Sequence, residues 1–394
     1  MLAVPKILWR SGIVLLTVTT ALLEAAFVHA SAAADSPPER GWVLVYYMSY
    51  DNDLERHGPG ILEALETGTK GTDLIVTVLA DDTDESGLKR YAISNAGRRK
   101  ELLDTDDSAS EEALTDYLAW VATHYPAKHY AVVFLDHGGR LDEMCLDERP
   151  GKGQKSRWLS ARRAGHALRE FRKEIGGEFD LLFLQQCGRG SIENLYNFRG
   201  TAKAVMASQM NVGAPNTYYE STLKWLAEHQ DATGSELARQ VMDTDEHYTQ
   251  YVCVDGPALE EIPSHLKPVV QVLLGEAGRP CKAPDLSGLA PCFRFGDETN
   301  YDLFQWLERA FRDNNRSTDS LREFERWVRD ALIVRTAVPV QQRSRIEEMS
   351  GLSLYVPVSQ RARQSWIDYP FYEGSRLREL WTVMYPPHPS AGDR

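Results

Sequence analysis

The sequence lacks the signatures of several large enzyme classes. Its 394 residues contain no G-x-S-x-G turn for a nucleophilic serine, no G-x-x-x-x-G-K-S/T phosphate loop, no H-E-x-x-H zinc helix and no G-x-G-x-x-G dinucleotide loop. Basic residues are also few for the number of acids: the net charge is −13, and no basic stripe could neutralise the phosphates of a nucleic acid. These absences disfavour α/β-hydrolase serine enzymes, P-loop enzymes, zinc peptidases and nucleic acid as a partner.

Cysteine is sparse, with five residues in the whole chain. In an exported protein an odd number indicates at least one free thiol. If Cys187 is the free one, the other four can pair in three ways. The loop chemistry between Cys281 and Cys292 favours that pair, which leaves Cys145 with Cys253. A fully reduced set is an equal alternative.

Long apolar runs are confined to the N-terminus. Lys6 and Arg10 precede a mostly apolar stretch at residues 13–28, and small residues follow it. This order is typical of a secretory signal peptide, so we expect removal of residues 1–30 and a linker at 31–40. An uncleaved N-terminal anchor is the alternative. No other segment approaches 18 apolar residues, so we expect an exported protein, periplasmic or extracellular, without stable membrane insertion after signal cleavage.

Apolar runs of strand length alternate with helical patterns over the first part of the remaining chain. The spacing predicts strands at residues 42–48, 74–79, 91–94 (at an edge), 130–136, 180–186 and 204–208. It predicts helices at 60–67, 111–124, 218–229 and 234–250, and helices that begin near 161 and 191. Such alternation indicates a parallel sheet covered by helices on both faces. Beyond Cys253 the composition changes, and the patterns predict helices at 300–313 and 317–331 and strands at 331–335 and 351–356.

Two of the predicted strands end on reactive side chains. The run Tyr130-Ala-Val-Val-Phe-Leu-Asp leads into His137, and Asp180-Leu-Leu-Phe-Leu-Gln-Gln leads into Cys187. Residues at the carboxyl ends of parallel strands lie in the crevice where α/β proteins bind ligands. Histidine can act as a base near neutral pH, and a cysteine beside it can be a nucleophile. In caspases the catalytic His precedes the Cys by about 50 residues, and this chain has the same spacing.

Glycines next to both side chains leave room for a substrate. The backbone N–H of Gly138 can approach a carbonyl oxygen closely, and the N–H of Cys187 is a second donor, so we expect an oxyanion hole between them. Taken singly, a cysteine at a strand end is more often a buried hydrophobe, and a His-Gly pair is more often a turn. The two together at this spacing favour a catalytic pair.

An ordered set of short motifs resembles the clostripain-like cysteine peptidases, relatives of caspases, gingipains and legumain. The matching segments are Val43-Leu-Val-Tyr-Tyr-Met-Ser-Tyr-Asp-Asn-Asp-Leu-Glu55, Phe134-Leu-Asp-His-Gly-Gly139, Asp180 to Cys187 with Ser191-Ile-Glu193, Ala207-Ser208 with Pro215, and Gly351-Leu-Ser-Leu-Tyr-Val-Pro357. The resemblance implies a caspase-like α/β/α sandwich with a mainly parallel central sheet. It implies a catalytic domain at 41–252 and a C-terminal region at 253–394 that adds helices and a late strand to the same fold. It also implies a cysteine endopeptidase that uses Cys187 as nucleophile and His137 as general base and acid.

The sequence departs from the resembled family at the specificity pocket. Clostripain-like enzymes favour Arg or Lys at P1, the substrate residue whose carbonyl carbon is attacked, and the resemblance places an acid where this chain has Gln185. Gln209, Met210 and Asn211 stand after Ser208 where acids would follow. A buried guanidinium without a carboxylate costs several kcal/mol. We therefore expect Gln185, Ser208 and Gln209 to bind substrate, and a P1 preference for neutral side chains that hydrogen-bond an amide.

Two further properties of the resembled family remain hypotheses for this chain. A cut between His and Cys can mature family members, and the segment 139–158 carries Arg149, Lys152, Lys155 and Arg157. Family members can also depend on calcium. Acidic clusters around Asp51, Asp81, Asp104 and Asp243 permit a calcium cofactor, but none has EF-hand spacing, and solvated loops are the simpler interpretation.

Two other functions stay open. The first is a non-catalytic caspase-like binding or scaffold protein in the exported compartment, which the loss of the pocket acids would suit. The second is a thiol transferase or transpeptidase on the same dyad, in which an amine instead of water takes the acyl group.

Overall fold

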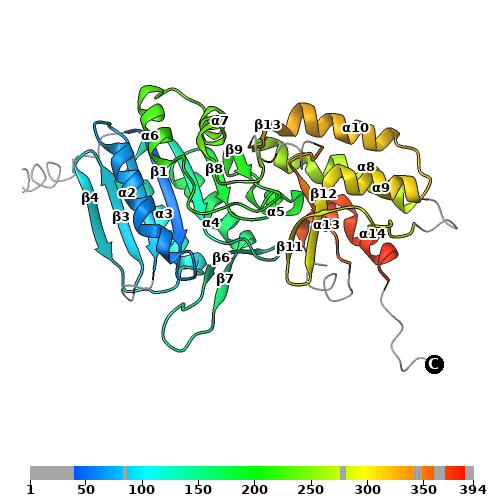
Figure 1. The fold of residues 1–394 in the computed structure, drawn as a ribbon, viewed down its shortest axis with the longest axis horizontal. Helices are drawn as coiled ribbons and strands as arrows, with labels where there is room; N and C mark the ends of the chain where they lie inside the picture. Colours follow the sequence, from blue (N-terminus) through cyan, green and yellow to red (C-terminus); the bar gives the residue numbers. More distant parts are fainter. Residues whose placement is uncertain are drawn as a thin grey trace, which may run out of the picture. The chain divides into compact units, whose positions relative to one another are not determined.

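A nine-stranded sheet runs through the protein, in the order β13-β10-β9-β8-β5-β1-β2-β3-β4 (Figure 1). Its five central strands are parallel: β9 (Ala202–Ala207), β8 (Phe179–Gln185), β5 (Ala127–Leu135), β1 (Arg40–Ser49) and β2 (Ile75–Asp81). Both edges are antiparallel: β3 (Lys89–Ser94) and β4 (Gly97–Leu102) on one side, β10 (Tyr251–Asp255) and β13 (Ile333–Ala337) on the other. The predicted α/β class is confirmed.

The computed structural model describes residues 40–82, 87–275, 281–339, 342, 346, 348–358 and 369–386. The expected signal peptide at 1–30 and all but the last residue of the expected linker at 31–40 lie outside these residues. In the part of the chain that is described, no helix is both long enough and apolar enough to cross a bilayer.

Helices cover both faces of the sheet. On one face lie α2 (Gly58–Thr69), α6 (Tyr219–Glu228) and α7 (Gly234–Thr244). On the other lie α3 (Glu111–His124), α4 (Ala161–Glu174) and α5 (Ile192–Leu195). Successive residues of β1 alternate between two hydrophobic clusters, with Val43 and Val45 in one and Leu44 and Tyr46 in the other. A strand buried on both faces reads as a continuous apolar run, which is why the central strands could be predicted.

The C-terminal region completes the sheet and adds a second layer of elements. Its helices are α8 (Ile262–Leu274), α9 (Leu303–Asp313), α10 (Asp319–Trp327), α13 (Pro370–Ser375) and α14 (Leu377–Met384). A small sheet pairs β11 (Pro291–Phe295), β12 (Glu298–Asp302) and β14 (Ser353–Tyr355). The strand β13 belongs to the central sheet, which ties this region to the first.

Short or irregular elements account for most differences from the predicted pattern. The strand at 91–94 is not an edge, because β4, whose polar sequence Gly-Arg-Arg-Lys-Glu-Leu shows no alternation, covers it. The segment at 139–158, for which no strand was predicted, forms a ribbon of β6 (Glu143–Asp147) and β7 (Arg157–Ser160), with Lys152 and Lys155 exposed between them. The helix expected at 234–250 ends at Thr244.

The favoured disulfides are not formed. All five cysteines are free thiols. Cys145 packs in the hydrophobic cluster on one face of the sheet and Cys253 in the cluster on the other, so the sheet separates them. Cys281 and Cys292 are both buried but not bonded.

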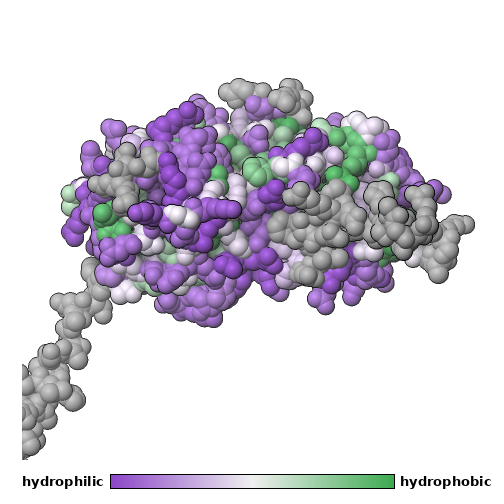
Figure 2. Space-filling view, turned by 90° about the horizontal axis from the view of Figure 1, so that it is seen from below, coloured by the Kyte–Doolittle hydropathy of each residue, from purple (hydrophilic) through white to green (hydrophobic). Residues whose placement is uncertain are grey.

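The surface in the view of Figure 2 is mainly hydrophilic, in keeping with an apolar interior that supplies the stability.

Candidate active site

The two reactive side chains follow neighbouring parallel strands. In the register of β5 and β8, Leu135 lies opposite Gln185. His137 lies two positions after Leu135, and Cys187 lies two positions after Gln185. Both side chains are half-buried, whereas the strands before them are buried throughout their central residues. The sheet therefore delivers both groups to the same edge, open to a substrate.

His137 is held by a carboxylate that the sequence analysis did not assign to the site. Its Nε2 lies 2.7 Å from Oδ1 of Asp53, an exposed residue in the loop after β1. The hydrogen bond from His137 lowers the pKa of Asp53. The other ring nitrogen, Nδ1, has no hydrogen-bond partner within the described ranges and so can serve the thiol. The sequence signal was present, because Asp53 belongs to the Asp-Asn-Asp segment that carried part of the family resemblance.

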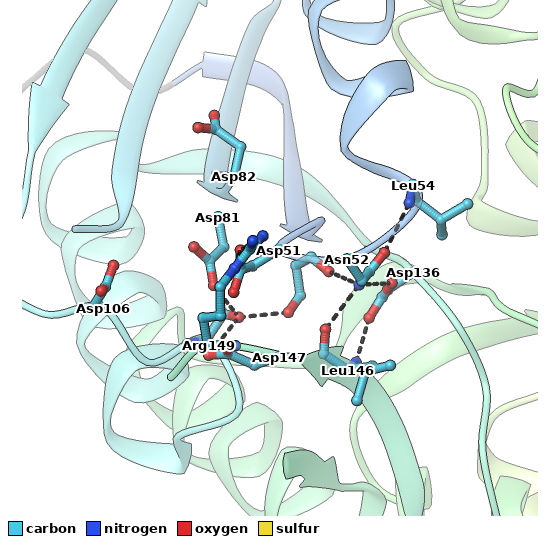
Figure 3. Close-up of polar contacts among 12 residues, drawn as sticks. Asp51, Asn52, Leu54, Asp81, Asp82, Asp106, Asp136, Leu146, Asp147 and Arg149 are labelled. Carbon is cyan, nitrogen blue, oxygen red and sulfur yellow. Dashed lines mark hydrogen bonds and ion pairs between the residues drawn. The ribbon is translucent and has the colours of Figure 1, made fainter. Parts of the chain in front are cut away.

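Asn52 fixes the loop that presents Asp53. Its buried Nδ2 donates to the carbonyl of Ser49 at 3.1 Å, to Oδ1 of Asp136 at 2.9 Å and to the carbonyl of Leu146 at 2.8 Å (Figure 3). Its Oδ1 accepts the backbone N–H of Leu54 at 3.0 Å. Asp136, directly before His137, is also buried, and this burial raises its pKa well above the usual range. One amide thus joins the loop of Asp53 to the strand end of His137.

The thiol of Cys187 faces the loop after β9. Its Sγ accepts the N–H of Val212 at 3.3 Å and lies 3.6 Å from the Val212 carbonyl oxygen. Burial raises the pKa of the Cys187 thiol, while the N–H of Val212 and the charge of Arg189 act in the opposite direction. No hydrogen bond joins Sγ to His137 among the described residues. Catalytic hydrogen bonds of free enzymes are often long and tighten only with substrate.

Gly138 brings the two strand ends into contact. A Cβ at this position would lie 2.0 Å from the carbonyl oxygen of Cys187, far inside any real contact. Within the described residues, neither the N–H of Gly138 nor that of Cys187 donates to another residue. These two N–H groups therefore have no acceptor in the described part of the protein, which the predicted oxyanion hole requires.

Ser208 and Gln209 are fully buried and hold the turn of the nucleophile instead of lining open space. The carbonyl of Ser208 accepts the N–H of Gly190 at 2.7 Å, and the carbonyl of Met210 accepts the N–H of Gly188 at 3.0 Å. The Gln209 amide donates to Gln250. In this conformation the turn after Cys187 is bound along its length by the segment that follows β9.

Gln185 is buried in a network of neutral groups. Its Oε1 accepts the hydroxyl of Tyr218 at 2.6 Å, and its Nε2 donates to the hydroxyl of Tyr219 at 3.0 Å and to Oδ1 of Asn216. Asn216 in turn donates to Oδ2 of Asp245 at 2.7 Å. The sequence analysis missed both Asn216 and Asp245, because their contact with Gln185 is made only by folding.

Three buried carboxylates lie behind the Asp53 loop. Carboxylate oxygens of Asp51, Asp81 and Asp147 lie within 4.8 Å of one another (Figure 3). The guanidinium of Arg149 donates to Asp51 through Nε at 2.8 Å, and Ser108 donates its hydroxyl to Asp81 at 2.6 Å and its N–H to Asp147 at 2.9 Å. Oxygen ligands suit calcium in kind. Each of the three carboxylates, however, already accepts a hydrogen bond from a protein donor, so we derive no step through a calcium ion.

Comparison with known proteins shows which class this site belongs to. The model of the clostripain family (Peptidase_C11) matches residues 46–371. No curated protein sequence gives a significant match. The fold is similar to an inactive zymogen C11 protease from Parabacteroides distasonis, with 17% identity, a TM-score of 0.66 and coverage of 86% of this chain and 99% of that one. It is also similar to a secreted C11 cysteine protease from Bacteroides thetaiotaomicron in complex with an irreversible peptide inhibitor, with 15% identity, a TM-score of 0.64, and 86% and 99% coverage.

The fold is that of the caspase-like cysteine peptidases, as predicted. The chain belongs to the clostripain family and is a cysteine peptidase. Family membership does not favour the alternative of a non-catalytic binding protein. The likeness to the two solved structures, at these identities, concerns the fold.

Replacing Gly138 with Ala should inactivate the enzyme without unfolding it. The added methyl would displace the carbonyl of Cys187 and misplace the oxyanion donors, so we expect kcat/KM to fall by about 100-fold. Gly60→Ala, in α2, is the matched control, because a Cβ there meets nothing within 4 Å. Steady-state kinetics on both variants test this, and full activity of Gly138→Ala would contradict the geometry.

The buried carboxylates should make stability fall as pH rises. Burial raises the pKa of Asp81 from 3.8 to about 8 and that of Asp147 to about 6. Between about pH 4 and 8 the unfolded chain has lost the Asp81 proton that the folded protein keeps, so stability decreases by up to about 1.4 kcal/mol per pH unit. Asp81→Asn should flatten this decline in urea unfolding from pH 5 to 8. An unchanged slope, equal to that of the exposed control Asp116→Asn, would exclude this role.

Proposed function

We propose that this protein is an exported endopeptidase that hydrolyses peptide bonds through Cys187 and His137. The observation that carries the proposal is the contact of the two strand ends: Gly138, next to His137, lies against the carbonyl of Cys187, with two backbone N–H groups left for an oxyanion.

In the proposed reaction His137 takes the thiol proton of Cys187, and the thiolate attacks the P1 carbonyl carbon. The negative charge on the carbonyl oxygen is stabilised by the N–H groups of Gly138 and Cys187. His137 then gives its proton to the leaving amine, and the acyl group stays on sulfur. Water, deprotonated by His137, attacks the thioester, and the carboxylic acid product leaves with Cys187 again in its thiol form.

Asp53 is proposed to hold the imidazole in the orientation that serves Cys187. Asp53→Asn should keep a hydrogen bond to Nε2 but remove the charge that stabilises the imidazolium, so we expect kcat to fall about 10- to 100-fold with little change in KM. Asp116→Asn, an exposed substitution on α3, is the control. Steady-state kinetics decide the matter, and a kcat for Asp53→Asn within twofold of the control would remove Asp53 from the mechanism.

The network around Gln185 supports a P1 preference that is not strictly basic. Gln185 and Asn216 present amides, and the oxygens of Asp245 accept hydrogen bonds from Asn216, from the hydroxyl of Tyr251 at 3.0 Å and from the N–H of Thr217 at 3.1 Å. The guanidinium of an arginine at P1 would reach amide and carboxylate groups that are already hydrogen-bonded to the protein. It would lose its hydration without gaining a free carboxylate as a partner. Neutral polar side chains suit this network better, because they bring no charge that needs a free carboxylate.

A peptide library with mixed P1 residues tests both the activity and this preference. The intact protein should cleave after neutral polar residues, with cleavage after Arg or Lys at least about tenfold weaker. Cys187→Ala should abolish cleavage, whereas Cys253→Ala should retain it because that thiol is buried in β10.

Three outcomes would contradict these proposals. Dominant cleavage after Arg or Lys that is lost in Asp245→Asn would show that a basic P1 residue displaces Asn216 and pairs with the acid behind it. Absence of cleavage, together with a Cys187 that does not react with an acylating thiol probe, would remove the peptidase proposal. Transfer of the acyl group to an added amine instead of water would identify a transpeptidase.

Export is proposed from the N-terminal sequence alone. Lys6, Arg10 and the apolar stretch at 13–28 have the order of a signal peptide. The similar protease from B. thetaiotaomicron is described as secreted.

Self-cleavage within 139–158 stays a prediction, and the exposed position of Lys152 and Lys155 between β6 and β7 would make this segment accessible.

A further inference from the structure

Arg189, two residues after the nucleophile, is a fully buried cation. Only 1% of its surface is exposed. Its guanidinium donates to backbone carbonyls: Nε to Cys187 at 3.2 Å, one terminal nitrogen to Arg140 at 3.1 Å and Glu143 at 2.8 Å, and the other to Gly139 at 2.8 Å. Within the described ranges no carboxylate lies within ion-pair distance of it. Its hydrogen bonds are made, and the negative charges of Glu298 and Glu143 act on its charge without a direct ion pair.

Burying a guanidinium in this way costs free energy, which indicates that its charge has a function at the site. A buried charge without an ionic partner is strongly disfavoured, and a buried methionine or leucine would fill the same space at lower cost. The guanidinium stays protonated in proteins, so the cost is not avoided by loss of a proton. Where a buried cation without a direct ion pair lies beside a nucleophile, the negative charge that develops during the reaction is a further counterpart for it.

The four carbonyls that Arg189 binds belong to the two segments that form the active site. The carbonyl of Cys187 is in the turn of the nucleophile, and those of Gly139, Arg140 and Glu143 are in the segment that follows His137. Nε of Arg189 would also lie 3.0 Å from a Cβ at Gly138. One planar side chain therefore joins both segments at the point where the oxyanion donors meet.

We propose that Arg189 is a positioning residue of this peptidase: it clamps the Cys187 turn to the segment after His137 through backbone carbonyls, and its positive charge stabilises the anionic forms of the site. The proposal rests on the proposed peptidase function. Lysine could not replace it fully, because a single ammonium cannot bind four separated carbonyls in a fixed plane. The charge and the clamp can therefore be separated by substitution.

The test compares the full-length mature protein with Arg189→Lys and Arg189→Met. Arg169→Met is the matched control, because Arg169 also donates from a partly buried guanidinium to backbone carbonyls, those of Asn197 at 2.8 Å and Arg199 at 3.5 Å, away from Cys187. Three quantities are measured: the urea midpoint of unfolding, the pH midpoint of Cys187 alkylation by iodoacetamide followed by mass spectrometry, and kcat and KM on a peptide.

For Arg189→Met we expect the alkylation midpoint to rise by about one pH unit and kcat to fall about 100-fold, with KM nearly unchanged. Arg189→Lys should keep a near-normal alkylation midpoint but lose about tenfold in kcat, because the charge remains and the clamp does not. Arg169→Met should change the urea midpoint only.

The proposal is overturned if folded Arg189→Met has the alkylation midpoint and kcat of Arg169→Met. If Arg189→Met does not fold, Arg189→Lys decides: unchanged kcat would exclude the clamp, and a midpoint shifted as far as about one pH unit would exclude the charge effect. The alkylation measurement needs no peptidase activity. A wild-type protein that cleaves nothing would thus refute the proposed function, while the midpoints would still report on Arg189.

Discussion

The active site depends on one close approach of backbone to backbone. Gly138 lies against the carbonyl of Cys187, at a distance that leaves no room for a side chain. Two parallel strands, β5 and β8, set this approach, because their register places the residues before His137 and Cys187 opposite each other. The strands are buried on both faces, so neither can shift without moving the whole sheet. Bonds from Gly188 and Gly190 to the segment after β9, and from Ser353 of β14 to Gly190, hold the nucleophile turn from the other side.

The polar groups around this contact are of two kinds: neutral amides and hydroxyls lie on one side of it, and a charged guanidinium lies on the other. Towards β9 and α6, amides and hydroxyls of Gln185, Asn216 and Tyr218 satisfy one another and shield Asp245. We propose that this neutral set governs which substrate side chain can enter. Towards the segment after His137 lies the buried cation Arg189, whose guanidinium donates to four backbone carbonyls. We propose that its charge acts on the reacting atoms. In this proposal, selectivity and reactivity depend on separate sides of the same turn.

Several features of the structure differ from the predictions because they depend on how the chain packs in three dimensions. The disulfide between Cys145 and Cys253 fails because the sheet stands between the two residues, which no spacing along the chain reveals. The strand β4 was missed because its charged residues give no apolar period, and its place in the sheet depends on pairing with β3. Ser208 and Gln209, expected to bind substrate, are buried and hold the nucleophile turn, so their contact with substrate stays a prediction.

The sequence alone determined the class of the fold, because buried parallel strands are continuous apolar runs. It also predicted the reactive pair, because the residues that end such strands share one edge of the sheet. It also determined the family, through motifs kept in order along the chain. The tertiary structure alone decided which partners those residues have: Asp53 on His137, Asp245 behind Gln185, and Arg189 between the two catalytic segments. Each of these contacts joins residues whose proximity follows from how the sheet and its loops pack, and hydrogen bonds between such residues leave no period or spacing in the sequence.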